Sequence, residues 1–131
     1  MSQAQFAGKT LFLASAFLNA LSVPGHIKYG IEHLNPALRT IKHLPDHVAG
    51  HESAIVGWDY MNASFLIAGI LNYHWSTTSG PRRPYEVAIL WTLLLSGGTV
   101  GVRFWNLSSF KPLLSLWLAP VLSLAGWVLS R

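Results

Sequence analysis

Four long apolar stretches constrain the fold of this chain more than any other feature of its sequence. A helix needs about 20 mostly apolar residues to cross the hydrocarbon core of a bilayer. Each stretch is close to that length, and together they occupy well over half of the 131 residues. The stretches cover residues 6–23, 53–75, 85–105 and 112–129. We therefore expect an all-α integral membrane protein with one domain, residues 1–131, that contains four transmembrane helices.

The composition agrees with a membrane protein. Apolar residues make up 51% of the chain and charged residues only 11%, against about 25% charged residues in an ordinary soluble domain. The net charge of +4 comes from basic residues scattered near the ends of the apolar stretches, where Lys and Arg reach lipid phosphates. We therefore expect membrane lipids, and not nucleic acid, as partners. The chain has no cysteine, which excludes disulfides, thiolate metal sites and cysteine nucleophiles.

The first apolar stretch has two interpretations. The residues Ala20, Leu21 and Ser22 resemble the small-residue cleavage site of a secretory signal. Only one basic residue, Lys9, lies in the region that leads into the stretch. We therefore expect this segment to be a retained membrane helix.

The links between the stretches predict the topology. Residues 76–84 and 106–111 are short and polar, and short links favour antiparallel neighbours in an up-down-up-down bundle. Residues 24–52 form a much longer first link. Within it, Asn35 and Pro36 predict the start of a short amphipathic helix on the membrane surface, and Pro45 predicts its end. This helix is either an anchor or a lid over a cavity.

The strongest candidate site lies in the second stretch, where Asp59 interrupts an apolar run. Ionisable groups inside a membrane usually face a bundle interior or a watery cavity. In an alternating bundle, the end of the first stretch, the start of the second and the end of the third lie on one side. We therefore expect five polar residues to converge there: His26, Glu52, Asp59, Asn62 and Arg103.

Two interpretations of this cluster are open. Asp59 and Arg103 can form an ion pair that only neutralises two awkward charges, although such pairs rarely add net stability. Alternatively the cluster lines a functional cavity, with Asp59 as the base and Arg103 holding its carboxylate. Asn62 would then position a water molecule, and Glu52 or His26 would act as the acid. The residues expected to contact substrate are Asn19, Tyr29, Trp58, Tyr60 and Thr99.

Other motifs are absent or weak. The sequence contains no phosphate-binding loop, dinucleotide fingerprint or serine elbow, so we expect no cofactor. His43, His47 and His51 recur every four residues, but Pro45 and Gly50 interrupt their helical register. We therefore favour loop histidines over a metal site. A further group offers a close-packing face for the bundle or for a homodimer: Gly97, Gly98 and Gly101.

Two features carry a resemblance to a known class of proteins: Arg103 and the run from Gly57 to Ala63, which contains Asp59 and Asn62. With these features the chain resembles the small membrane-bound cyclases and epoxide hydrolases of fungal polyketide and terpenoid pathways. This resemblance implies a cofactor-free enzyme of the endoplasmic reticulum. Its reaction would be epoxide hydrolysis, epoxide-opening cyclisation or isomerisation of a lipophilic small molecule. Two alternatives stay open: a cofactor-free anthrone-type oxygenase, and a non-enzymatic lipid or sterol binder or accessory subunit.

Overall fold

The computed structural model describes residues 2–41 and 45–131, and over these residues the chain is helical and contains no strand. The helical segments Gln3–Arg39, His47–Thr78 and Pro84–Asn106 are each long and apolar enough to cross a membrane, and Leu114–Leu129 is a shorter apolar helix. The all-helical prediction is therefore confirmed. In chain order the elements are α1 (Gln3–Tyr29), the π-helical turn η1 (Gly30–Leu34), α2 (Asn35–Arg39), α3 (Pro45–Thr78), α4 (Pro84–Asn106), the π-helical turn η2 (Leu114–Leu118) and α5 (Ala119–Leu129).

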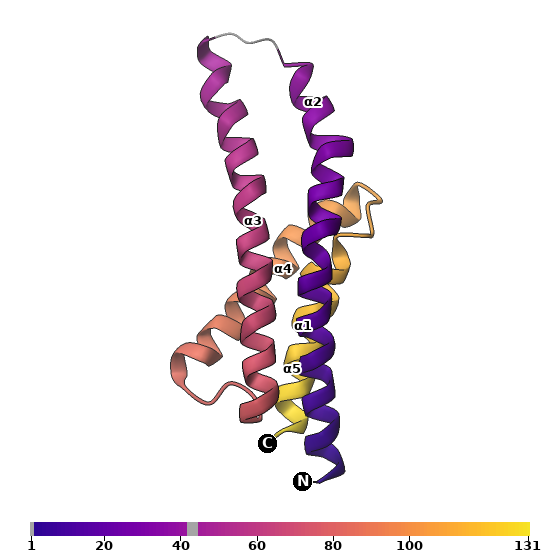
Figure 1. Ribbon diagram of the computed structural model, residues 1–131, viewed down its shortest axis with the longest axis vertical. Coiled ribbons are helices and arrows are strands. Elements are labelled where there is room, and N and C mark those ends of the chain that lie inside the picture. Colours follow the sequence, from indigo (N-terminus) through magenta and orange to yellow (C-terminus); the bar gives the residue numbers. More distant parts are fainter. Residues whose placement is uncertain (1, 42–44) are drawn as a thin grey trace.

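The first three elements form one continuous helical rod (Figure 1). Pro24 lies inside α1 without ending it; a proline removes one backbone hydrogen bond, and the neighbouring turns keep theirs. At the other end of η1, the N–H of Asn35 donates to the carbonyl oxygen of Gly30, the bonding pattern of a π-helix. Asn35 therefore continues the helix and does not cap a new one.

The predicted long link over residues 24–52 is wrong, because helix occupies both its beginning and its end. The short helix expected from Asn35 exists as α2, but it continues the axis of α1 (Figure 1). Pro45, expected to end that helix, is the first residue of α3, a position where its missing N–H costs nothing. Residues 42–44 lie outside the described residues.

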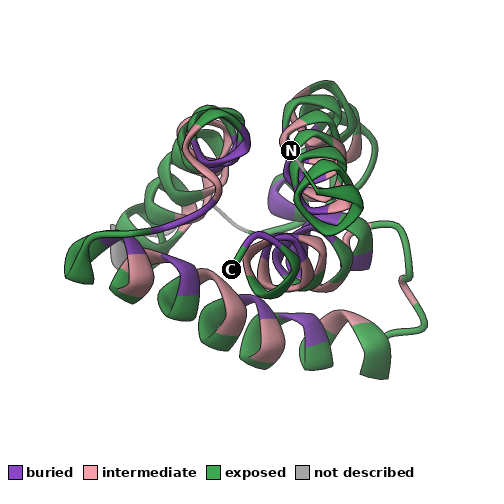
Figure 2. Ribbon diagram, turned by 90° about the horizontal axis from the view of Figure 1, so that it is seen from below, coloured by how far each residue is buried: buried purple, intermediate pink, exposed green. Residues whose placement is uncertain are grey.

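The long helices alternate in direction along the chain (Figure 1). α1 packs against α3 on one side and α5 on the other, whereas α4 packs against η2 and α5 and has few contacts with α3. Figure 2 shows that α4 crosses the other helices obliquely and buries only the side turned toward them. Although a short turn joins α3 to α4, the two helices therefore diverge.

One end of the molecule, which we term the closed end, is tightly packed. Phe12, Trp75 and Leu90 are fully buried there, and the rings of Phe12 and Trp75 meet edge to face with centroids 6.1 Å apart. The backbones of α1 and α5 are also in close contact, because a Cβ added at Gly8 would lie 2.7 Å from the carbonyl oxygen of Gly126. The turn after α3 fits against this core because Gly80, at φ +96°, carries no side chain.

A buried chain of hydrogen bonds joins three helices just above this core. The hydroxyl of Ser15 on α1 lies 2.9 Å from that of Ser123 on α5, and Ser123 donates to Oδ1 of Asn72 on α3 at 2.6 Å. The Nδ2 of Asn72 donates to the carbonyl oxygen of Ala68. Polar groups that satisfy one another in this way hold helices together where water is excluded.

Candidate functional site

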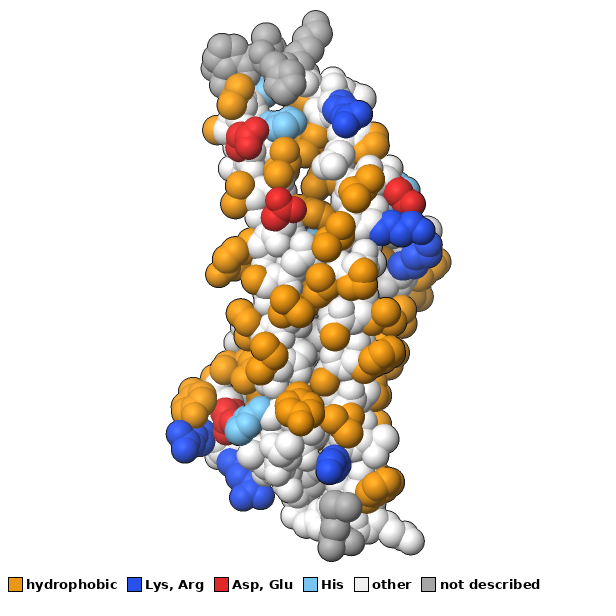
Figure 3. Space-filling view, viewed as in Figure 1, with side chains coloured by type: hydrophobic (Ala, Val, Ile, Leu, Met, Phe, Trp, Pro, Cys, Tyr) orange, Lys and Arg blue, Asp and Glu red, His pale blue; other side chains and the backbone are white. Residues whose placement is uncertain are grey.

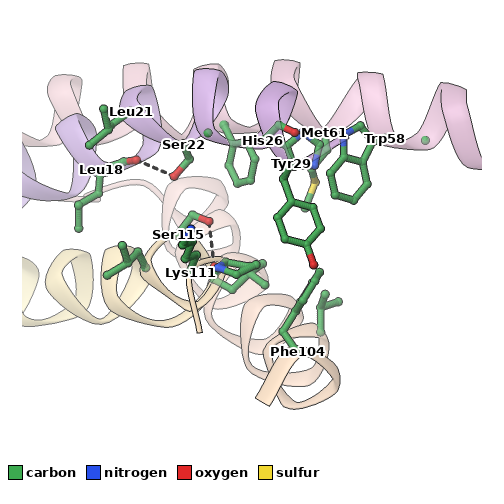
Figure 4. Close-up of a pocket in the computed structure, with 17 residues that line it drawn as sticks. Leu18, Leu21, Ser22, His26, Tyr29, Trp58, Met61, Phe104, Lys111 and Ser115 are labelled. Atoms are coloured by element: carbon green, nitrogen blue, oxygen red, sulfur yellow. Dashed lines mark hydrogen bonds between the residues drawn. The ribbon is translucent and has the colours of Figure 1, made fainter. Parts of the chain in front are cut away.

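A groove opens beyond the closed end, where α4 diverges from α3. Its upper part has a volume of about 480 Å³ and lies between α1, α3, α4 and η2. Figure 4 shows the side chains that point into it. Its walls are mainly apolar and include Leu18 and Leu21 of α1, Met61 and Phe65 of α3, Phe104 of α4 and Leu114 of η2.

Two glycines explain why α4 lies where it does. A Cβ added at Gly97 would collide with the carbonyl oxygen of Leu116, and one added at Gly101 would collide with the indole of Trp117. These glycines therefore let α4 lie directly on η2. Gly98, in contrast, faces open space. The predicted close-packing face thus serves the bundle through Gly97 and Gly101, and the homodimer stays a prediction.

One polar pair lies at the wall of the groove. The Nδ1 of His26 is 3.1 Å from Oδ1 of Asn62. An amide oxygen only accepts hydrogen bonds, so Nδ1 of His26 carries the hydrogen and Nε2 is left as an acceptor. Since His26 lines the groove, this arrangement offers a hydrogen-bond acceptor to a molecule inside it.

Aromatic side chains fix the position of that histidine. The indole of Trp58 stacks on the imidazole of His26 with centroids 3.9 Å apart and an interplanar angle of 10°, and Phe65 meets it edge-on at 5.4 Å. The Nε1 of Trp58 donates to the backbone oxygen of His26 at 3.3 Å. Gly30 leaves room for the indole, because a Cβ there would lie 2.5 Å from Nε1 of Trp58.

The structure brings together about half of the residues that the sequence analysis selected. His26, Trp58 and Tyr29 line the upper groove, and Asn62 holds His26. Tyr29 stacks on Trp58 with centroids 5.9 Å apart. Asn19 lies nearer the closed end and is only 5% exposed.

The expected convergence is wrong for the others, which are exposed and do not line the groove: Glu52, Asp59, Tyr60, Thr99 and Arg103. Among the described residues, Asp59 and Arg103 form no ion pair. The catalytic and substrate-binding roles assigned to these residues stay predictions, without the support of a shared cavity.

Helix geometry explains the difference. Successive residues of an α-helix are rotated by about 100° around its axis, and α3 turns the face of Trp58 and Phe65 toward α1 and the groove. Asp59, one residue after Trp58, therefore lies on an adjacent side of the helix. Glu52, two turns earlier, shares the side of Asp59 and lies near the start of α3. This end of α3 extends past α4 and α5 (Figure 1).

The sequence analysis missed the apolar wall and one basic residue at its rim, Lys111. Met61 and Phe65, four residues apart, were a recognisable helical signal beside Asn62. α2 supplies no residue to the groove, so the lid interpretation has no structural support. Of the predicted histidine series, His43 lies outside the described residues, and Nδ1 of His51 is 3.3 Å from Oε1 of Glu52.

The chemistry of the groove suits a molecule that is apolar along most of its length. Apolar walls exclude water, and the few fixed polar groups select the orientation of a ligand. In comparisons with known proteins, no family model, curated protein or solved structure matches the chain.

Proposed function

We propose that the chain is an integral membrane protein that binds a lipophilic small molecule in the groove between α3 and α4. Large apolar side chains project outward from each long helix, among them Phe17 at 65%, Ile70 at 67% and Leu95 at 66% exposure. Figure 3 shows such side chains over the middle of the molecule. Exposing this much apolar surface to water is unfavourable, whereas lipid accommodates it.

The charged residues give the position of the bilayer in this proposal. On α1 no Asp, Glu, Lys or Arg lies between Lys9 and Lys28, a distance of about 28 Å along the helix that matches a hydrocarbon core of about 30 Å. Trp58 of α3 stacks on His26 and packs on Gly30, so this part of α3 lies beside residues 26–30 of the first helical rod. Asp59, the residue after Trp58, is therefore at about the same depth in the bilayer as Lys28. Asp59 is then a residue of the membrane boundary and not of its centre.

The single observation that carries the proposal is the apolar groove with its fixed polar pair. Small-molecule sites typically have volumes of about 300–1,000 Å³, apolar walls and a few oriented polar groups, and the upper groove of about 480 Å³ has all three properties. The polar group of the ligand would lie at Nε2 of His26, and its apolar part would extend between Met61 and Phe65 of α3 and Phe104 of α4.

Photoaffinity labelling in lipid nanodiscs tests this proposal. The probe is an octanol that carries a diazirine, which bonds covalently to adjacent residues on illumination. Gly57 lines the groove, and a side chain there meets no neighbouring atom. Gly57→Leu should therefore fill the groove and abolish the part of the labelling that excess octanol competes away.

Gly98→Leu is the matched control, because Gly98 also faces open space and does not line the groove. It should label like the unaltered protein. Equal labelling of both variants, or no competed labelling in the unaltered protein, would contradict the proposal.

A second candidate function is acid–base chemistry on the bound molecule, the class indicated by the resemblance to cyclases and epoxide hydrolases with its location in the endoplasmic reticulum. The observation that favours it is His26, a titratable side chain at the groove. The carboxylate of Asp59 interacts with His26 electrostatically. His26 would transfer the proton, and Asp59 would act through it.

Turnover of a lipophilic epoxide separates the two candidates. An enzyme should lose about 10²–10⁴-fold of its turnover rate in His26→Gln, because glutamine keeps a hydrogen-bond acceptor but cannot transfer the proton. A binding protein should show no turnover above the lipid blank in any variant.

A further inference from the structure

A second cavity of about 340 Å³, which we term the lower part, adjoins the upper groove on the side of the closed end. The two parts have five lining residues in common. The shared residues are Met61, Phe65, Val100, Ser115 and Leu116. The lower part ends at the hydrogen-bonded pair of Asn72 and Ser123.

Asn19 lines this lower part and has an unused hydrogen-bonding atom. Its side chain is buried, with only 5% of the residue exposed. The Nδ2 donates to the backbone oxygen of Ser15 at 2.9 Å, but no described residue donates to Oδ1. Because Asn19 lines the lower part, its amide oxygen can accept a hydrogen bond from a molecule bound there.

Two polar side chains that line the lower part already use their donors elsewhere in the chain. Asn72 uses its amide nitrogen on Ala68 and its oxygen on Ser123. The hydroxyl of Ser115 donates to the backbone oxygen of Pro112 at 3.1 Å. Asn19 therefore differs from Asn72, which joins helices and is fully satisfied within the chain.

Asn19 and His26 lie on one face of α1, because seven residues are close to two full turns. Their positions are separated by about 10 Å along the axis. His26 offers Nε2 as an acceptor and Asn19 offers Oδ1 as an acceptor. Ser22 lies between them on the same face, and its hydroxyl donates to the backbone oxygen of Leu18 at 2.7 Å.

From this arrangement, and resting on the proposed function, we propose that the ligand is an apolar molecule with a hydroxyl group at each end. One hydroxyl donates to Nε2 of His26 and the other to Oδ1 of Asn19. A ligand that carries a single hydroxyl leaves one of the two acceptors without a partner.

Competition between matched alcohols tests this inference. Linear alkanediols with a hydroxyl at each end and alkanols of equal chain length compete with the diazirine octanol in nanodiscs, at matched concentrations in the membrane. The diol should compete at least about tenfold more strongly than the alkanol, the effect of one hydrogen bond of about 1.4 kcal/mol. The advantage should depend on chain length and be greatest for diols whose hydroxyls are about 10 Å apart, the axial rise between positions 19 and 26.

Asn19→Leu should remove the diol advantage and leave alkanol competition unchanged. Thr92→Val is the control that keeps the advantage, because the hydroxyl of Thr92 is exposed and donates to Ala88 within α4. If Asn19→Leu does not fold, Asn19→Ala and the chain-length series in the unaltered protein still decide the matter.

Equal competition by diol and alkanol in the unaltered protein would overturn the inference, and so would a diol advantage that persists in Asn19→Leu. Either result leaves the proposed function intact when Gly57→Leu still abolishes labelling. Loss of the proposed function itself would instead appear as labelling that Gly57→Leu does not change.

Discussion

The two ends of this helical molecule differ in how their helices meet. At the closed end, α1 and α5 touch through Gly8 and Gly126, and large side chains such as Trp75 are fully buried. At the groove, α3 and α4 diverge, and Trp58 is only partly buried against His26. We infer that the closed end supplies most of the stability, whereas the groove leaves apolar surface and hydrogen-bonding atoms available to a ligand.

Paired tryptophan substitutions should show the largest difference between the two ends. Trp75→Ala removes a fully buried side chain and should lower the free energy of unfolding by about 3–5 kcal/mol. Trp58→Ala should cost clearly less, because its ring already borders the groove. Equilibrium unfolding in detergent measures both, and equal losses would remove the distinction between the ends.

Substitutions of two neighbouring glycines test how closely α4 packs on η2. Gly97→Ala places a methyl group against the carbonyl oxygen of Leu116 and should cost about 1–3 kcal/mol through overpacking. Gly98→Ala meets no atom and should change the free energy of unfolding by less than about 0.5 kcal/mol. A costly Gly98→Ala would mean that this face packs on something else, such as a second copy of the chain.

Substitutions of two buried asparagines, one near the closed end and one in the groove, should also differ in their effect on stability. Asn72→Leu breaks the bond from Ser123 on another helix and should destabilise the fold by about 1–3 kcal/mol, whereas Asn19→Leu loses only a bond to the backbone oxygen of Ser15 within α1 and should cost clearly less. Unfolding of both variants without ligand is the measurement. A large loss in Asn19→Leu would show that its Oδ1 has a partner within the chain.

The smallest effect is expected at Asp59. Because Asp59 is exposed and does not line the groove, Asp59→Asn should change the free energy of unfolding by less than about 0.5 kcal/mol and leave photolabelling unchanged. Reduced labelling would mean that Asp59 takes part in ligand binding, as predicted from the sequence.

Much of the fold was predictable because apolar length is a strong signal. The stretch over residues 85–105 became α4, Pro84–Asn106, almost residue for residue. The first link was not predictable, because residues 24–52 contain Pro24, Pro36 and Pro45, which normally end helices. Here Pro24 is tolerated inside α1, and Pro45 begins α3.

The candidate site was only partly predictable, for reasons of helix rotation and tilt. Asn19 and His26, both selected from the sequence, line the two parts of the groove. The depth and direction of Asp59 depended on which side of α3 meets α1, which apolar residues such as Met61 and Phe65 decide. The divergence of α4 depends on the contact of Gly97 with η2, and no pattern within one helix reveals it.

The location of the photolabel shows whether a lipophilic molecule binds in the groove between α3 and α4. After illumination with the diazirine octanol, the unaltered protein is digested and the modified residues are identified by mass spectrometry. Our account predicts label on both walls of the groove, at Met61 or Phe65 of α3 and at Val100 or Phe104 of α4. Label confined to outward-facing residues such as Ile70 and Leu95, with none in the groove, would contradict it.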